Sequence, residues 1–468
     1  MSAIVLAAGA GSRFGGGKLV AALEGRPVLQ HVLDRLADSG VDEVVVVLGD
    51  DAETVEGTMR WRSERRVRNP DPTRGLSSSV RVGIEALDDG VDAALVVLGD
   101  QPRVPVAAIR AVFDAEVDDG RPIVVPAYDG DGGRNPVLLG RAAFALVAEA
   151  SGDRGLGPVL AAHPELVREV PVVGQNPDVD TRDDLVALLE TAWADRVHAN
   201  NAQVDRFREV PDAPDFYAPV TSLFRADPTR VDEPALAVLL GLVRPGDTWL
   251  DIGAGAGRYA LPIARAVAAS GGEVIAVDPS AGMLAGLHEI ALEHGIANVR
   301  TIEGRWPDVA DEVGRADVAL IAHVSYDIAA IGPFVRAMEA AARRLCVAVL
   351  MERQPSSIAD VCWPPVWGES RVPLPALPEF EELLRAFGRE PAIERLEREP
   401  RRFGSRDELE GFLRRQLWVA PGSAADRRFL ESLEPLLVTH AEGRVGLRDQ
   451  RPLPIGIVIW EPSSAPTP

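Results

Sequence analysis

Two glycine-rich turns, each directly after a short apolar stretch, constrain the fold of this chain more than any other feature. The first spans residues 6–18 and the second residues 250–258. Glycine at such spacing lets backbone N–H groups approach a ligand closely, and a helix that begins after the turn favours negative charge. The first turn contains Arg13 and Lys18, whereas an acid, Asp251, precedes the glycines of the second. We therefore expect two nucleotide-like ligands that differ in charge.

The length and composition of the chain limit its class. Its 468 residues are too many for a single core and fit two or three domains. The net charge of −22 disfavours nucleic acid or an anionic membrane as a partner, so small-molecule substrates are expected. Two cysteines form no disulfide framework, and seven histidines show no metal-ligand spacing. Because we find no signal peptide and no apolar run of roughly twenty residues, we predict a cytoplasmic protein of undetermined oligomeric state.

Apolar stretches alternate with amphipathic segments along most of the chain, which is typical of buried parallel sheets covered by helices. We therefore predict an α/β fold class with two Rossmann-like domains: residues 1–190, a linker at 191–204, and residues 205–468. Strands are expected at 3–6, 44–48, 94–98, 123–125, 170–173, 247–252, 273–277, 299–302, 318–322, 346–351 and 455–460. Helices are expected at 28–39, 379–387 and 406–418.

The first glycine-rich turn is not a Walker loop, because Ser12 stands where that motif has glycine and Leu19 replaces its Ser or Thr. The turn nevertheless contains two cations, Arg13 and Lys18, beside a loop of backbone N–H groups. This combination of charges and donors suits the phosphates of a nucleoside triphosphate. Asp100 follows an apolar stretch, and the carboxyl end of a buried strand opens on the crevice where α/β folds bind ligands. A carboxylate at this position could hold Mg²⁺ against the phosphates, although Gly-Asp after a strand is also a common turn.

Taken together, these residues resemble the molybdenum-cofactor nucleotidyltransferase family, the MobA-like group with a GT-A-type fold. The resemblance covers about residues 1–190. The signature Leu-Ala-Ala-Gly-x-Gly-x-Arg-x-Gly, ending in Lys, is matched at 6–18. Further landmarks of the family are matched in order at 75–79, 98–102, 135–138, 152–155 and 178–181.

The resemblance implies a role for the matched positions. Arg13, Lys18 and Asp100 would be catalytic, and Asp100 would bind Mg²⁺ together with Asp180. Members that begin Leu-Ala-Ala-Gly tend to use CTP, and Ala8 places this chain with them. The nucleotide would be bound by Leu6, Ala7, Ala8, Gly9, Gly11, Lys18, Ser77 and Ser78.

The acceptor of the nucleotidyl group is left open by one departure from the family. Cofactor cytidylyltransferases usually have Gly-His-Pro where this chain has Arg134-Asn135-Pro136. The resemblance implies transfer of CMP to a phosphorylated small molecule such as molybdopterin, and a sugar phosphate is the alternative. A third hypothesis is a catalytically silent, nucleotide-sensing domain that regulates the second half, but the presence of Arg13, Lys18 and Asp100 disfavours it.

The second glycine-rich turn lacks the dinucleotide fingerprint, because Arg258 stands where that motif has its third glycine. Asp251 ahead of the glycines favours a ligand with a cationic end, such as S-adenosylmethionine, over a pyrophosphate. Asp278 ends the next apolar stretch, where it can accept hydrogen bonds from both ribose hydroxyls. A dinucleotide would use the same arrangement, so spacing alone does not separate the two ligands.

From about residue 205 to 468 the chain resembles the class I S-adenosylmethionine-dependent methyltransferases. His323, at the end of the expected fourth strand, is a candidate base or substrate contact, or a histidine that only lines the cleft. Trp363 and Trp367 are candidates for a substrate pocket or for the core. The resemblance implies cofactor contacts at Asp251, Gly253, Gly255, Gly257, Asp278, Glu303 and Gly304.

Overall fold

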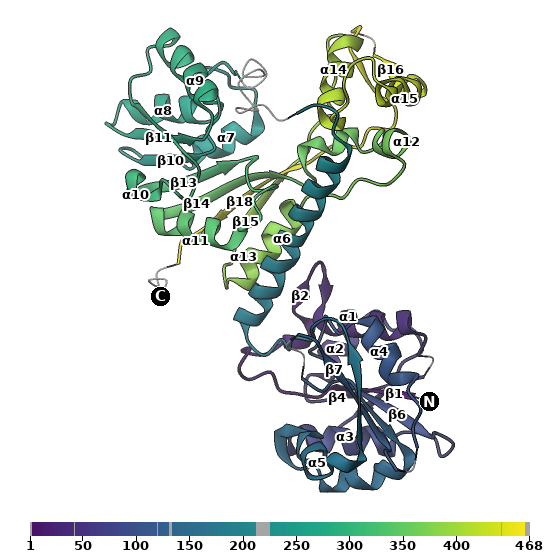
Figure 1. Ribbon diagram of the computed structural model, residues 1–468. Coiled ribbons are helices and arrows are strands. Elements are labelled where there is room, and N and C mark those ends of the chain that lie inside the picture. Colours follow the sequence, from purple (N-terminus) through teal and green to yellow (C-terminus); the bar gives the residue numbers. More distant parts are fainter. Residues whose placement is uncertain are drawn as a thin grey trace. The chain divides into compact units, whose positions relative to one another are not determined.

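The computed structural model describes residues 2–41, 43–118, 120–130, 133–211, 225–440 and 442–463. The chain divides into two compact units, Met1–Leu188 and Leu189–Pro468. Each unit is built around its own seven-stranded sheet (Figure 1). This arrangement confirms the α/β fold class expected from the alternation of apolar and amphipathic segments.

The sheet of the first unit has the strand order β5-β4-β1-β6-β8-β7-β9. Strand β1 pairs in parallel with β4 and β6, while β8 runs antiparallel to β6 and β7. The sheet is thus mostly parallel, and the antiparallel β8 was not expected from the sequence. Its strands are β1 (Ser2–Ala7), β4 (Val44–Leu48), β5 (Arg65–Arg68), β6 (Ala93–Leu98), β7 (Ile123–Tyr128), β8 (Val137–Gly140) and β9 (Val167–Val172).

Helices cover both faces of this sheet, because alternate residues of β1 enter two separate cores. Ala3 and Val5 pack with α1 (Val28–Ser39), α2 (Ala52–Thr58) and α4 (Val106–Phe113). Ile4 and Leu6 pack on the opposite face with α3 (Leu76–Glu85) and α5 (Gly157–Ala162). The carboxyl ends of β1, β4 and β6 therefore open between two layers of helices, where α/β folds bind their ligands.

The second unit has the strand order β12-β11-β10-β13-β14-β18-β15. The first five strands are parallel, and β18 runs antiparallel to both β14 and β15. On one face, a core unites the sheet with the helices α7, α8 and α9. The strands are β10 (Thr248–Ile252), β11 (Glu273–Asp278), β12 (Val299–Glu303), β13 (Ala316–Ala322), β14 (Ala342–Met351), β15 (Ala392–Leu396) and β18 (Ile455–Trp460). The helices of this face are α7 (Pro234–Gly241), α8 (Ala260–Ala268) and α9 (Ala281–Glu293).

On the other face of this sheet lie α11 (Ile331–Ala341) and α13 (Leu377–Ala386) (Figure 1). A separate core joins α12 (Trp363–Trp367), α14 (Arg406–Leu417) and α15 (Ala424–Leu433). Trp363 is fully buried in that core, and the rings of Trp363 and Trp367 both contact Phe207. The structure thus supports the core interpretation of these two tryptophans over the substrate-pocket interpretation.

Residues 191–204, where a linker was expected, instead form part of the helix α6 (Arg182–Phe207). Trp193, Val197 and Val204 recur at near-helical spacing and are buried within the second unit. The indole N–H of Trp193 donates to the Ile328 carbonyl at 2.9 Å. Within the described ranges, no helix is both long enough and apolar enough to cross a membrane.

Candidate active sites

The glycine-rich turn after β1 folds around the carbonyl of Gly11. The N–H groups of Phe14, Gly15 and Gly16 all donate to that carbonyl, at 3.0–3.1 Å. Gly11 has φ +57°, in the left-handed region that a side chain rarely adopts, and a Cβ there would lie 3.3 Å from Lys18 Cβ. The turn therefore needs glycine at this position to bring Lys18 back toward the sheet.

Lys18 joins two acids at the carboxyl edge of the sheet. Its Nζ lies 2.6 Å from Asp100 Oδ2 and 3.3 Å from Asp180 Oδ1, and Arg13 Nη1 lies 3.2 Å from Asp180 Oδ2. Burial alone would lower the pKa of Lys18, but the negative charges of Asp100 and Asp180 outweigh it and raise that pKa above its ordinary value. The structure thus brings together the four charged residues predicted from the sequence as catalytic or metal-binding.

Asp180 is held in place by the N-terminal end of α6. The backbone N–H groups of Asp180 and Thr181 donate to Asp184 Oδ2 at 3.0 and 2.7 Å. Among the described residues, no group of three or more His, Cys, Asp or Glu side chains is placed to hold a metal ion. A cation at Asp100 and Asp180 would therefore take its remaining ligands from phosphate oxygens and water, as Mg²⁺ commonly does.

A buried polar network that the sequence did not reveal supports these acids. Gln101 Nε2 donates to Asp178 Oδ1 at 2.7 Å, and Asn176 Nδ2 donates to Gln101 Oε1 at 2.9 Å. Burial, followed by the charge of nearby Asp100, raises the pKa of Asp178. Residues 178–181 had been noted as a landmark, but only the fold places Asp178 beside Asp100.

Ser78 and Ser79, at the start of α3, form hydrogen bonds within the protein. Ser78 Oγ donates to the Gly75 carbonyl at 2.7 Å and accepts from Asn69 Nδ2 at 2.7 Å. Asn69 Nδ2 also donates to Ser79 Oγ at 3.0 Å. Ser77 and Ser78 are both buried. Asn69, which ties α3 to the end of β5, was not identified from the sequence because a single asparagine after a polar strand carries no motif.

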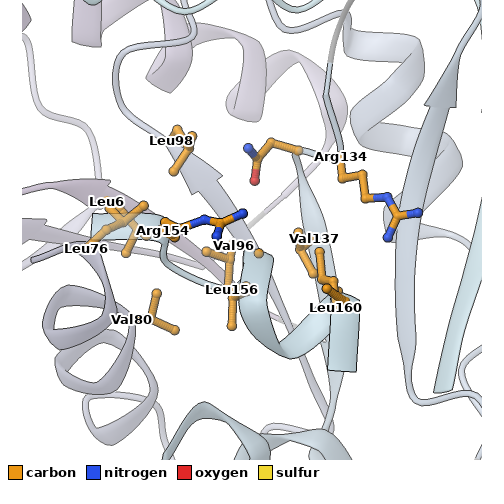
Figure 2. Close-up of a pocket in the computed structure, with 13 residues that line it drawn as sticks. Leu6, Leu76, Val80, Val96, Leu98, Arg134, Val137, Arg154, Leu156 and Leu160 are labelled. Carbon is orange, nitrogen blue, oxygen red and sulfur yellow. The ribbon is translucent and has the colours of Figure 1, made fainter. Parts of the chain in front are cut away.

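Beside this charged site lies an apolar cavity of about 240 Å³ (Figure 2). Leu6 and Leu98 line it, and they lie at or near the carboxyl ends of β1 and β6, the strands that precede the glycine-rich turn and Asp100. Arg134, Asn135 and Arg154 are its polar lining residues. Of the residues predicted to bind the nucleotide, this cavity includes only Leu6. The other residues of the first turn and the serines of α3 do not line it.

In the second unit, a cavity of about 490 Å³ opens at the carboxyl ends of β10, β11 and β13. Asp251, Gly253, Gly255, Asp278 and Gly304, all predicted from the sequence, line it. Glu303 and Gly257 do not line it. A Cβ at Gly257 would lie 2.8 Å from Leu261 Cγ, so this glycine permits close packing of the turn on α8. Lining residues that the sequence did not indicate are Arg305, Trp306, Asp327 and Phe334.

Asp251 is a buried carboxylate with unused hydrogen-bonding capacity. It is 3% exposed, and among the described residues its Oδ1 has no hydrogen-bond partner. Burial, followed by the negative charge of Asp278, raises the pKa of Asp251 to about 7. A bound cationic group would relieve this unfavourable state. The orphaned oxygen therefore fits the ammonium of an amino-acid-bearing cofactor better than it fits a pyrophosphate.

Asp278 is the last residue of β11, and its carboxylate accepts hydrogen bonds from backbone N–H groups. Its Oδ2 accepts from Gly255 N at 2.8 Å, and its Oδ1 accepts from Ser280 N at 2.9 Å. These bonds hold the carboxylate at the cavity wall, where an ionised acid can accept further bonds from ribose hydroxyls.

His323 lines the same cavity from the end of β13. It has φ +58°, and within the described chain its Nδ1 is buried without a partner. Burial, followed by the positive charges of Arg398 and Arg258, lowers the pKa of His323 to about 4, so its imidazole is neutral at pH 7. The position fits either interpretation drawn from the sequence, a substrate contact or a lining residue.

The two sites define the class of protein. A cluster in which Lys18 and Arg13 pair with Asp100 and Asp180 lies in one α/β unit, and a cavity lined by Asp251 and Asp278 lies in the other. This is the arrangement of a two-domain transferase. Residues 3–167 match the family model of the MobA-like NTP transferase domain, and residues 250–346 match that of a methyltransferase domain. Both are families of enzymes, and the matches confirm the expected fusion.

Individual relatives match the first domain. The bifunctional protein GlmU of Sphingopyxis alaskensis is 33% identical over 144 residues, which cover 30% of this chain and 31% of the relative. The 2-C-methyl-D-erythritol 4-phosphate cytidylyltransferase of Streptomyces avermitilis is 35% identical over 133 residues, covering 27% of this chain and 53% of the relative. The chain thus spans about a third to a half of the length of these relatives. The crystal structure of Rv0371c from Mycobacterium tuberculosis H37Rv is 32% identical, with 40% of this chain and 96% of that chain covered and a TM-score of 0.37.

Proposed function

We propose that the first domain transfers CMP from CTP, in the presence of Mg²⁺, to the phosphate of a small molecule. The single observation that supports this most is the position of Lys18 between Asp100 and Asp180 at the carboxyl edge of the sheet. An ammonium held between two carboxylates marks a place where a divalent cation and polyphosphate would meet complementary charge. Molybdopterin is the acceptor that the family resemblance implies, and the cytoplasm is the compartment we expect for such an enzyme.

This transfer needs no protein nucleophile. A phosphate oxygen of the acceptor attacks the α-phosphorus of CTP in line, the bond to the bridging oxygen breaks, and pyrophosphate leaves. Lys18 and Arg13 offset the negative charge that builds on the leaving oxygens, and the turn at 6–18 positions the triphosphate. Mg²⁺, held by Asp100 and Asp180, would supply further charge neutralisation there.

Asp100→Asn should remove the Mg²⁺ dependence of CTP binding while leaving the fold intact. The substitution keeps the size of the side chain and removes the negative charge that attracts the cation. Calorimetric titration of CTP with and without Mg²⁺ measures the effect, and GTP and ATP titrations test the nucleotide preference. An unchanged Mg²⁺ dependence in Asp100→Asn would contradict the assignment of Asp100 as a metal ligand.

We propose further that the second domain transfers a methyl group from S-adenosylmethionine to a small molecule. The orphaned Oδ1 of Asp251 in a cavity bounded by Asp278 supports this cofactor. S-adenosylmethionine supplies an electrophilic methyl group on a sulfonium. The protein would hold the ammonium at Asp251 and the ribose at Asp278, and it would align the acceptor by the remaining wall of the cavity, because methyl transfer depends mainly on alignment.

Asp278→Ala is expected to weaken S-adenosylmethionine binding by about 1–3 kcal/mol, the usual cost of losing hydrogen bonds to a charged group. Glu273→Ala serves as the matched control, because Glu273 begins the same strand, β11, but is exposed and does not line the cavity. Isothermal titration of both variants decides the point. Equal affinities in the wild type and Asp278→Ala would rule out the ribose contact.

A further inference from the structure

The apolar cavity of the first domain has a wall that can form few hydrogen bonds. Most of its lining is aliphatic and includes Leu76, Val80, Val96, Val137, Leu156 and Leu160. Sugar hydroxyls and polar heterocyclic rings lose their bonds to water when they enter such a space without new partners. Aliphatic groups, by contrast, gain affinity by leaving water. The cavity therefore favours the apolar part of a ligand.

Two arginines line this cavity, and they differ in the contacts that they make. In Figure 2 the side chain of Arg154 extends between Leu6 and Val96, whereas the guanidinium of Arg134 points away from them. Arg134 Nη2 pairs with Glu169 Oε1 at 3.0 Å. For Arg154, no hydrogen bond or ion pair occurs within the part of the chain that is described. A free guanidinium beside an apolar wall is suited to a phosphate or carboxylate.

Close packing fixes the backbone of the turn that carries Arg154, whose side chain is itself exposed. The turn η4 (Gly152–Arg154) lies against the start of α3, where a Cβ at Gly75 would stand 2.5 Å from the carbonyl carbon of Gly152. On the other side of Arg154, a Cβ at Gly155 would stand 2.7 Å from Leu76 Cδ2. Two glycines thus allow the turn to approach α3 closely, so the position of the Arg154 backbone is built into the fold.

The cavity also contains the residues by which this chain departs from cofactor cytidylyltransferases. Arg134 and Asn135, which stand in place of Gly and His in that group, both line it. Leu98, two residues before Asp100, lines it as well. The departure in sequence and the apolar wall therefore coincide at one place, next to the proposed metal and triphosphate site.

We propose that this cavity is the acceptor site and that it selects a phosphate monoester with an aliphatic body, whose phosphate is bound by Arg154. The proposal rests on the nucleotidyl transfer proposed above, but its acceptor class differs from molybdopterin, because the aliphatic wall offers few hydrogen bonds to a polar heterocyclic ring. In the reaction, a phosphate oxygen of the monoester forms the bond to the α-phosphorus of CTP, and pyrophosphate leaves with the electron pair of the broken bond. The product is a diphosphate diester of cytidine whose alkyl group occupies the cavity.

The experiment measures the binding of methyl, butyl and hexyl phosphate, and of glucose 1-phosphate, to the full chain. Each titration contains Mg²⁺ and a non-hydrolysable analogue in place of CTP. Each methylene that enters the cavity should raise affinity by up to about fourfold, so hexyl phosphate should bind at least about tenfold more tightly than methyl phosphate. Glucose 1-phosphate should bind no better than methyl phosphate. Pyrophosphate release with CTP, followed by phosphorus NMR of the product, tests whether the bound monoester is also the acceptor.

Two variants and one control locate the effect. Arg154→Gln should weaken hexyl phosphate about tenfold or more and leave the CTP analogue unaffected, because the charge-assisted bonds to phosphate are lost. Val80→Thr, of nearly the same shape, should reduce the preference for hexyl over methyl phosphate. Arg168→Gln removes an exposed arginine that does not line the cavity and should change neither affinity.

The outcomes separate this inference from the proposed function. The inference is overturned if glucose 1-phosphate binds as tightly as hexyl phosphate, or if affinity does not rise with the length of the alkyl group. In either case, binding of CTP would still support the proposed nucleotidyl transfer. An equal loss of CTP-analogue affinity in Arg154→Gln would assign Arg154 to the nucleotide and also overturn it. No binding of CTP to the wild type would remove the proposed function itself.

Discussion

Lys18→Ala is expected to lower the rate of nucleotidyl transfer by about a thousandfold, the upper range for removal of one electrostatic contact to a transition state. Lys18 Nζ lies within 3.3 Å of both Asp100 and Asp180, so its removal leaves two like charges near each other as well as an uncompensated triphosphate. Pyrophosphate release with CTP and an alkyl phosphate measures the rate. The Asp100 and Asp180 pair would remain available for Mg²⁺, and CTP binding should therefore weaken less than the rate falls.

The same variant tests the independence of the two sites. S-adenosylmethionine binds in the other unit according to our proposal, so Lys18→Ala should leave its affinity unchanged. Lys18→Arg is the matched control for charge, and it should recover part of the rate, because the guanidinium keeps the charge but not the compact shape of the ammonium. A parallel loss of nucleotide and S-adenosylmethionine binding in Lys18→Ala would contradict the two-site model.

S-adenosylmethionine affinity should rise as the pH increases through about 7, because the cationic ligand requires ionised Asp251. The pKa of this buried acid is raised to about 7 in the free protein, so below that pH the carboxyl must first lose a proton before it can bind the ammonium. Affinity should change by up to tenfold per pH unit between about pH 5 and 7 and reach a plateau above about pH 8. Titrations at several pH values measure this dependence.

Asp251→Asn should abolish most of that pH dependence and weaken binding at pH 8 by about 10–100-fold, as expected for loss of a charged hydrogen bond. The stability of the free protein provides an independent measurement. An acid whose pKa is raised by folding is fully compatible with the fold below about pH 4 and costs stability as the pH rises to about 7, here by about 4 kcal/mol. Asn should therefore make the free protein more stable at pH 8. A pH dependence that survives in Asp251→Asn would assign it to another group.

Much of the fold could be predicted because its strands are continuously apolar. Val44–Leu48 and Ile455–Trp460 are buried strands at the residues expected. The edge strand Arg65–Arg68 was not predicted, because three arginines in four residues are not typical of a strand. These residues are extended because they pair with β4, a contact that the local sequence does not indicate. A linker was predicted at residues 191–204, but these residues are helical. The helix buries Trp193 and Val197 against other parts of the second unit, which the local sequence cannot indicate.

The sequence by itself determined the two ligand-binding turns and their difference in charge, because backbone conformation after a strand depends on local glycines and the flanking charges are local as well. Lys18, Asp100, Asp251 and Asp278 could all be named on that basis. Only the tertiary structure decided what surrounds them. Arg154 reaches the apolar cavity because Gly75 and Gly155 let a distant turn pack on α3. A cavity is formed by residues far apart in the chain, so no local pattern encodes its shape, and the acceptor it selects can be inferred only once these residues are brought together.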